Sequence, residues 1–465
     1  MPIETQTPGS EGWWLNRLIT RLGDRLDYYT LFDRYYRGDC DLPEGAEGCR
    51  HAYRMLQRKA RLNFGELIVE APRERMMVVG FRTGSGDQRE TDDTAWRYWQ
   101  ANSLDADQAL IDRPALSMGD AYAIVGPVNP DIGAPLITPE DPRQVITEHD
   151  PIRRRKVTAA LKVFVDDVAG LDRAYLYLPG RVLTAARPAS SSGSLSYTSE
   201  RWEWTSARAI TDINGRLIND VPVVRFANRS DGDLSQPGRS ELDGSIDTLD
   251  RINHMVLQRV VIATMQAFRQ RAIKGVPIVD EAGRDIDYSG IFSPDPGALW
   301  LLPETAEMWE SQQVDLSPVL SSVRHDIQDL AASTRTPLFY LTPDAANGSA
   351  EGASLAREGL IHKVLDRIAQ AGESWERAMS LAFAFAGDLE RASQVDTEVL
   401  WQPPERFSLA EKYDAAAKAQ AAGVPWRSVM SDVLQFSPQQ VARMETERAA
   451  EAFLTAPIDL TGATA

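Results

Sequence analysis

The stretch SELDGSIDTLDRINHMVLQRVVIATMQAFRQRAIK, residues 240–274, decides the fold of this 465-residue chain. Apolar side chains recur in it at a spacing of seven, at Leu249, Val256 and Ala263, which predicts a helix with one apolar stripe. Ser240 is a preferred helix cap, and the acidic residues come early and the basic ones late, as the helix dipole favours. A helix of about 32 residues is roughly 48 Å long. We therefore expect a shaft that needs packing partners.

A strongly acidic segment follows the predicted shaft. Between Val276 and Asp315, nine acidic residues stand against a single base, Arg284. The same segment carries the apolar run Trp300 to Leu302. We expect it to form a small β element.

A second helix and a loop come next. Ser317 and Pro318 are a strong helix start, because a capping serine precedes a proline at the first helical position. The helix is expected to end before Pro337. Residues 342–352 are polar and rich in glycine, which is unfavourable for packing in a core, so we expect a mobile loop there.

A third long helix is predicted from about residue 353 to residue 386, where apolar residues recur at helical spacing. Gly359 and Gly372 lie inside it. Each internal glycine costs about 1 kcal/mol relative to alanine, and glycines are common sites of helix bending. Both positions are therefore candidate bends.

The regions on either side of these helices differ in class. Residues up to about 240 predict a mixed α+β domain with mainly antiparallel strands, because strands and helices do not alternate regularly. Residues 408–453 predict two or three short helices, after a strand near Trp401. In the first region, we expect helices at 14–36, 51–67, from Asp92, and at 105–118, and strands at 67–69, 76–81, 121–125, 145–148, 157–165 and 174–178.

Composition excludes several classes of protein. The net charge of −17 and the pI near 4.9 disfavour a nucleic-acid binder whose affinity depends on neutralising phosphates. Two cysteines are too few for a secreted disulfide scaffold of this size. The N-terminus lacks the pattern of a cleaved signal, and no apolar run is long enough to span a membrane. We expect a soluble chain with no membrane partner.

Few residues in the sequence fit a metal site or a catalytic site, and none of them has a characteristic spacing. Cys40, Cys49 and His51 do not have the spacing of a zinc site. The acidic pairs at 140–141 and 166–167 fit solvated turns better than a divalent metal site. No phosphate-binding loop or nucleophile elbow occurs, and the five histidines are scattered. We therefore expect no catalytic residues, no cofactor and no metal.

One dense basic run, residues 153–156, stands out in this acidic chain. A solvated turn leading into a strand explains it best. A contact with DNA or with a scaffolding protein is the alternative.

Taken together, the order of these elements resembles that of the portal proteins of long-tailed double-stranded DNA bacteriophages, over nearly the whole chain. Local motifs agree with the resemblance: YYRG at 35–38, NR at 228–229 followed by GRSE at 238–241, and RTPLFYL at 335–341. No single motif is diagnostic, and their order carries the resemblance. It implies an α+β, mainly helical portal subunit with a wing, a stem, a clip, a channel helix and a crown.

The resemblance also implies boundaries. The wing is expected at 1–240 with a joining strand near 395–403, the two stem helices at 241–273 and 317–336, the clip at 274–316, the tunnel loop at 337–352, the kinked channel helix at 353–388, and the crown at 404–465 with a disordered C-terminal tail.

It further implies function and partners. Such subunits form a ring, usually of twelve, at one capsid vertex, and DNA enters and leaves through it. The implied partners are the terminase large subunit, a head-completion or adaptor protein, and the major capsid and scaffolding proteins, with assembly in the host cytoplasm. The alternatives are a metal-dependent nuclease or hydrolase and another capsid or scaffolding protein.

The candidate site residues fall into two groups. The tunnel loop that would face DNA contains Thr342, Asp344, Asn347, Gly348, Ser349 and Glu351. The clip surface that would dock partners contains Asp280, Glu281, Asp285, Asp287 and Glu307.

Overall fold

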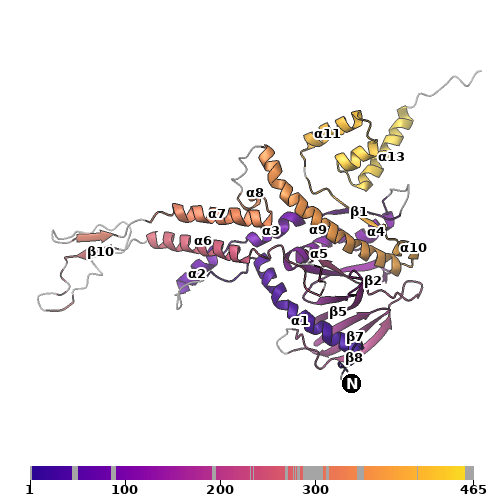
Figure 1. Cartoon of the computed structure of the whole chain (residues 1–465), viewed down its shortest axis with the longest axis horizontal. Helices are drawn as coiled ribbons and strands as arrows, with labels where there is room; N and C mark the ends of the chain where they lie inside the picture. The colour runs from indigo at the N-terminus through magenta and orange to yellow at the C-terminus, as the bar shows by residue number, and fades with distance from the viewer. Residues whose placement is uncertain are drawn as a thin grey trace, which may run out of the picture. The chain divides into compact units, whose positions relative to one another are not determined.

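The chain folds as two compact units (Figure 1). Unit 1 comprises Met1–Cys40, Asn63–Ile246 and Leu330–Ala465, and unit 2 comprises Asp41–Leu62 and Asp247–Asp329. Every pair of strands is antiparallel in the described residues, and the predicted α+β class is confirmed.

The computed structural model describes residues 3–43, 51–84, 91–190, 195–230, 232–233, 235–267, 271–275, 277, 279, 283–285, 307–310, 314–342, 350–405 and 407–455.

Two helices of unit 1, α1 (Glu11–Tyr36) and α4 (Asp93–Ala101), begin after residues whose side chains satisfy free backbone N–H groups. The Ser10 hydroxyl accepts a hydrogen bond from Trp13 N, and the Asp92 carboxylate accepts from Thr94 N and Ala95 N. The main helices are α1 (Glu11–Tyr36), α3 (Phe64–Arg73), α4 (Asp93–Ala101), α5 (Leu104–Met118), the short α8 (Leu338–Leu341) and α10 (Leu389–Ala392), and the long α9 (Ala350–Phe385).

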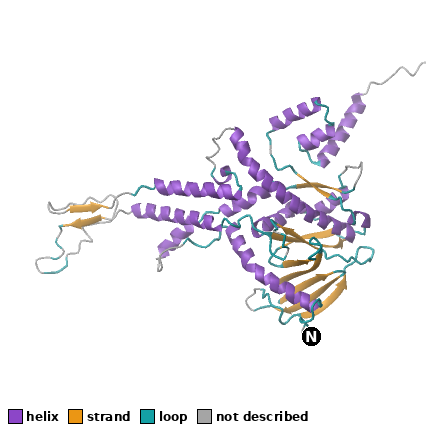
Figure 2. Cartoon of the chain, in the orientation of Figure 1, coloured by secondary structure: helices purple, strands orange, loops and turns teal. Residues whose placement is uncertain are grey.

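Three sheets belong to unit 1 (Figure 2). A five-stranded sheet has the order β4-β5-β6-β7-β8, a three-stranded sheet the order β3-β2-β9, and a third sheet pairs β1 with β12. The strands are β1 (Val78–Arg82), β2 (Asp120–Asn129), β3 (Ala134–Glu140), β4 (Val145–His149), β5 (Val157–Asp166), β6 (Leu171–Leu178), β7 (Arg181–Pro188), β8 (Glu203–Ala209), β9 (Val223–Ala227) and β12 (Glu398–Trp401).

The apolar stripe of α1 covers one face of the five-stranded sheet. Leu15, Leu18 and Leu22 are fully buried against residues such as Leu161 and Leu176. Buried and partly buried residues alternate along β6, as expected for a strand with one covered face. The helix predicted at 14–36 is therefore confirmed.

Helix α9 packs in the centre of a second core. Trp375 on α9 is fully buried, and its ring centroid lies 4.7 Å from that of Trp99 and 4.8 Å from that of Phe226. Such edge-to-face aromatic pairs contribute about 0.5–1.5 kcal/mol each beyond the burial of their area. This packing fixes α9 against α4 and β9.

Unit 2 contains two long helices and a short strand pair. Helix α6 (Ile246–Ala267), which starts at the last residue before this unit, and helix α7 (Ser317–Thr334) share the ion pair of Arg251 with Asp326 at 3.0 Å. The unit also contains α2 (His51–Ala60), and β10 (Arg271–Lys274) pairs with β11 (Glu307–Glu310). The β element predicted in the acidic segment is thus present in the described residues.

Helix α6 is shorter than predicted. Residues 241–245 form turns, and the helix starts at Ile246. Ser240 does not cap it, because its buried hydroxyl donates to Ser117 O and accepts from Leu242 N. The heptad stripe is buried at Val256 but exposed at Ala263. Tertiary contacts therefore determine where the helix begins.

The predicted strand at 67–69 is wrong. These residues belong to α3, whose start is capped by the Asn63 side chain accepting from Glu66 N. A short apolar run has the same appearance in a buried helix and in a buried strand. The predicted strand at 76–81 is present as β1.

The C-terminal residues form short helices, as predicted. Helix α11 (Leu409–Ala421) begins with a capping box between Ser408 and Glu411. Helix α12 (Trp426–Ser428), the π-helix η2 (Val429–Val433) and helix α13 (Pro438–Thr455) follow. The tail predicted to be disordered lies outside the described residues.

Candidate functional site

The predicted tunnel loop is described only at its ends. Thr342 follows α8 and is partly buried, with its backbone N–H and its hydroxyl both donating to Leu338 O. The prediction for Glu351 is wrong: this residue lies in the first turn of α9, which begins at Ala350 and not at the predicted residue 353. Asp344, Asn347, Gly348 and Ser349 lie outside the described residues. The site can therefore be built from the elements that flank the loop.

A buried ion cluster lies beside the N-terminal half of α9. Lys363 Nζ is 2.8 Å from Oε2 of Glu241, and Arg367 Nε is 2.6 Å from Oε1. Asn228 Nδ2 donates to the same Oε1 at 2.9 Å. Glu241 and Lys363 are each 4% exposed. Together with Thr334 these residues are called the Glu241 cluster.

Lys363 joins two distant parts of the chain. Its Nζ also donates to Thr334 O, at 3.1 Å, at the end of α7. Glu241 lies in the turns that precede α6. One ammonium group therefore contacts the chain just before residues 247–329 and just after them.

The charges of this cluster follow from its surroundings. Burial alone would raise the pKa of the Glu241 carboxyl, but Lys363 and Arg367 outweigh burial and hold that pKa at about 2. Burial lowers the pKa of Lys363, and Glu241 opposes this shift. A buried charge with hydrogen-bonded partners of opposite sign is stable, whereas one without them is costly.

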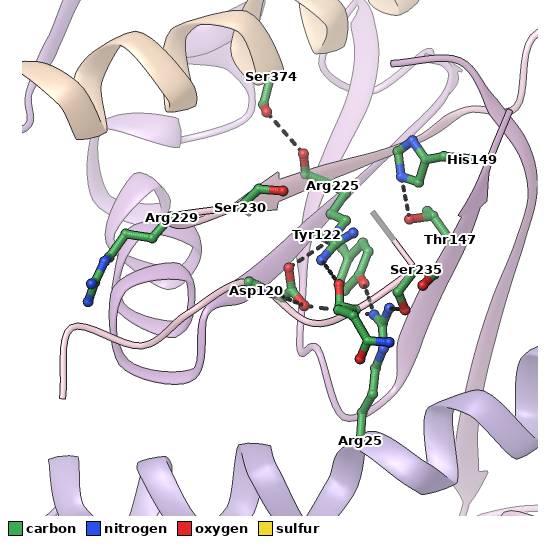
Figure 3. Close-up of polar contacts among 12 residues, drawn as sticks. Arg25, Asp120, Tyr122, Thr147, His149, Arg225, Arg229, Ser230, Ser235 and Ser374 are labelled. Atoms are coloured by element: carbon green, nitrogen blue, oxygen red, sulfur yellow. Dashed lines mark hydrogen bonds and ion pairs between the residues drawn. The ribbon is translucent and has the colours of Figure 1, made fainter. Parts of the chain in front are cut away.

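A second buried network connects α1 with the three-stranded sheet (Figure 3). The Asp120 carboxylate accepts from Arg225 Nε at 2.8 Å and from the Tyr29 hydroxyl at 2.7 Å. Arg25 Nη2 and Arg225 Nη2 donate to the carbonyls of residues 235 and 236. Burial raises the pKa of the Tyr29 hydroxyl, and Asp120 adds to this shift.

Helix α9 is also tied to strand β9 and to the residues after it. The Ser374 hydroxyl donates to Arg225 O at 2.9 Å (Figure 3), and Arg229 N donates to Gln370 Oε1 at 3.1 Å. The Arg229 side chain in turn donates to Ser240 O at 3.2 Å. Polar contacts therefore hold one side of α9 from Lys363 to Ser374.

The two candidate bends lie inside a continuous helix. Gly359 and Gly372 are both within α9. A Cβ at Gly359 would meet open space, whereas one at Gly372 would lie 3.5 Å from Trp401 Nε1. The bends themselves stay a prediction.

The acidic residues predicted to form a clip surface are only partly described. Glu307 begins β11 and lies 4.0 Å from Lys274 Nζ, with both side chains more than 80% exposed. Asp285 is exposed. Trp309, at 57% exposure, adds an apolar surface next to these charges. Asp280, Glu281 and Asp287 lie outside the described residues.

Other candidates for chemistry gain no support. In the described part of the chain, no group of three or more His, Cys, Asp or Glu side chains could hold a metal ion. Glu140, Asp141 and Asp166 each form an ion pair with a lysine or arginine at 2.6 Å. Among the described helices, none is both long and apolar enough to cross a membrane.

The predicted site residues include none of those at the centre of the Glu241 cluster or of the network around Asp120. One signal was available for Lys363, since it lies between Leu360 and Val364 on the apolar side of a predicted helix. Arg225 gives the same signal inside the apolar strand β9. A charged residue in an apolar pattern indicates a buried partner, but the sequence does not identify that partner.

Comparisons with known proteins give consistent results. The family model "Phage portal protein, SPP1 Gp6-like" matches residues 15–452. The portal proteins of Mycobacterium phages D29 and L5 are 29% and 28% identical to this chain over 372 and 378 residues. These alignments cover 77% and 78% of this chain and 72% and 73% of the relatives.

A weaker similarity links this chain to a solved structure. A chain from the neck of a native GTA particle, computed with C12 symmetry, matches with a TM-score of 0.39 and 13% identity. The match covers 81% of this chain and 91% of that one. Neither the family model nor the curated relatives support a metal-dependent nuclease, a hydrolase or a scaffolding protein.

Proposed function

Because this chain belongs to the phage portal protein family, we propose that its copies form a ring at one capsid vertex, with a channel through which DNA is packaged and ejected. The chain is a structural component of the phage particle, and the resemblance drawn from its sequence is confirmed. The family match over most of the chain is the observation that carries the proposal. We also infer that the chain is not an enzyme and that a separate ATPase supplies the energy.

We propose the parts at the boundaries that the resemblance implies: wing at 1–240 with the strand near 395–403, stem helices at 241–273 and 317–336, clip at 274–316, tunnel loop at 337–352, channel helix at 353–388 and crown at 404–465. Helices α6 and α7 lie within the proposed stem ranges, and β11 lies within the proposed clip. Strand β10 spans the boundary between stem and clip, and α9 begins at Ala350, three residues before the proposed channel helix.

The charge of the chain suits a conduit. Twelve copies with a net charge of −17 each would carry about −204. Negative charge along a bore repels phosphates, so DNA slides without sticking. Low affinity of the channel wall for DNA is an advantage, because the DNA has to move through it.

The acidic clip is the proposed docking site for the terminase large subunit and, later, for a head-completion or adaptor protein. Exposed carboxylates such as Asp285 and Glu307 complement basic partner surfaces. Charge reversal at Asp285, Asp287 and Glu307 should weaken motor binding in a pull-down assay. Unchanged binding would refute this assignment. Major capsid and scaffolding proteins are the proposed partners of the wing during assembly in the host cytoplasm.

The Glu241 cluster would set the base of the tunnel loop. Lys363 fixes the end of α7, which leads into the loop, to α9, which follows it. We propose that this anchoring lets residues 343–349 approach DNA while both ends stay in place. Deleting residues 347–352 should impair packaging or retention of DNA in the head. A deletion phage with normal packaging and retention would exclude an essential role for the loop.

The size of the assembled protein tests the main proposal. A ring of twelve has a mass of about 0.6 MDa, twelve times 51.6 kDa. Native mass spectrometry should detect a species near this mass, and negative-stain images should show a central hole. A purified chain that stays monomeric at every concentration and cleaves DNA would contradict it.

A further inference from the structure

The turn between β4 and β5 presents the dense basic run of the chain to solvent. Residues 153–156 are three arginines and a lysine, and all four are exposed. Ile152, beside them, is 90% exposed. Residues 150–156 are called the basic tip. An exposed isoleucine followed by four cations is a candidate contact surface on this acidic chain.

The basic tip has a defined backbone. The Asp150 carboxylate accepts from Ile152 N at 2.8 Å and from Arg153 N at 3.0 Å. Asp150 N donates to Lys156 O at 2.9 Å, and Lys156 N donates to Arg153 O at 2.7 Å. A surface that is ordered before binding loses less conformational entropy on docking.

His149 supports the tip from inside the protein. Its Nδ1 lies 2.9 Å from Arg154 O, and because a carbonyl only accepts, Nδ1 carries the proton. Its Nε2 then accepts from the Thr147 hydroxyl at 3.0 Å (Figure 3). Burial and the nearby Arg225 lower the pKa of His149 to about 4. The imidazole is therefore neutral near pH 7 and keeps this donor pattern.

Two hollows flank the tip. One has a volume of about 590 Å³ and the other about 680 Å³, and Arg154 lines both. Arg155 pairs with Glu373 at 2.5 Å. No ion pair within the described part of the subunit involves Arg153, Arg154 or Lys156. The tip thus has cationic charge and space around it for a partner.

We propose that the basic tip docks on an acidic surface of the next copy of this chain in the ring. The proposal rests on the proposed function, which supplies the neighbouring copy. Each copy has a net charge of −17, so adjacent copies repel unless cations lie at their contact. The tip supplies such cations.

DNA is the less favoured occupant. Phosphates would satisfy the arginines, but a duplex backbone offers no apolar partner for Ile152. A protein surface offers carboxylates and apolar side chains together. The experiment below separates the two.

The test compares two charge reversals of equal size. The variant R153E/R154E/K156E should raise the protein concentration needed for half-maximal ring assembly about tenfold or more, because attraction becomes repulsion. The control R208E/R216E/K418E changes three exposed cations elsewhere in unit 1 and should shift assembly much less. Native mass spectrometry over a concentration series measures both.

A second variant tests whether the apolar side chain of Ile152 contributes to docking apart from the basic residues. I152D keeps the basic run and the backbone contacts of the tip, and it should weaken assembly by a smaller factor. Circular dichroism and thermal melting check that each variant is folded.

Three results have distinct meanings. If the wild type forms rings and the tip reversal assembles as well as the control, the proposal is overturned while the proposed function stands. If the wild type forms no ring, the proposed function is wrong, and the docking proposal that rests on it is wrong too. If the tip reversal abolishes binding to a short DNA duplex at low salt and leaves assembly unchanged, DNA is the occupant and the proposal is wrong.

Discussion

Two buried carboxyl groups in unit 1 behave in opposite ways. Glu241 is 4% exposed and Asp112 is 3% exposed, yet the pKa of Glu241 falls to about 2 and that of Asp112 rises to about 7. Burial raises the pKa of both. The difference is that two cations contact Glu241, whereas the closest hydrogen-bond donor to Asp112 is the neutral Gln108 amide at 2.8 Å.

Burial alone therefore does not decide the charge of a carboxyl group. Ion pairing keeps Glu241 charged, and Lys363 connects α9 both to Glu241, before residues 247–329, and to Thr334, after them. Within the described residues, Asp112 lacks a contacting cation of this kind, and desolvation is the main cause of its raised pKa. The comparison predicts that the two residues respond oppositely to the loss of their charge.

Glu241→Gln should have the largest effect. In the part of the chain that the structure describes, it leaves Lys363 buried without a counter-charge, and Arg367 keeps only the more exposed Asp366. Breaking a buried pair costs about 3–5 kcal/mol. Thermal unfolding at constant protein concentration should show a clear drop in the melting temperature. The matched control is E398Q, whose carboxylate is 59% exposed and pairs with Arg82. Similar melting temperatures for both variants would show that the Glu241 cluster contributes little.

The cost of E241Q should also depend on pH. The folded pKa of Glu241 lies below its unfolded value of about 4.3. Its contribution is therefore present above that unfolded value and is lost as the pH falls towards about 2. The difference between wild type and E241Q should shrink as the pH falls from 5 to 2.

Asp112→Asn should have a smaller effect of the opposite sign. The folded pKa is raised, so the wild type is favoured when Asp112 is protonated and loses this stability as the pH rises from about 4 through 7. Asparagine stays neutral throughout and still accepts from Gln108. At pH 8 the variant should be more stable than the wild type, by an amount of the order of a few kcal/mol. Equal pH dependence of the two proteins would contradict this titration.

The exposed pair between β10 and β11 should respond least. Lys274 and Glu307 lie 4.0 Å apart and are 88% and 83% exposed. Exposed pairs contribute about 0–1 kcal/mol, so K274M should change the melting temperature very little. A loss as large as that of E241Q would show that this surface is buried in the state that is measured.

The local pattern predicts what local interactions determine. Periodic apolar residues were sufficient to predict α1, and Asp92 was sufficient to predict the start of α4. The start of α6 could not be predicted, because Ser240 bonds to Ser117 instead of capping a helix. The link between Glu241 and Lys363 joins residues 122 positions apart, and no local pattern encodes it.

The contact of Lys363 with both Glu241 and Thr334 has a consequence for how the chain can change. Residues 247–329 leave unit 1 and return to it at one buried cluster. A segment attached in this way is an insertion, and insertions tolerate exchange better than segments that share a core with their host. We therefore expect that residues 247–329 can be exchanged for a segment that fits a new partner while the Glu241 cluster keeps its contacts.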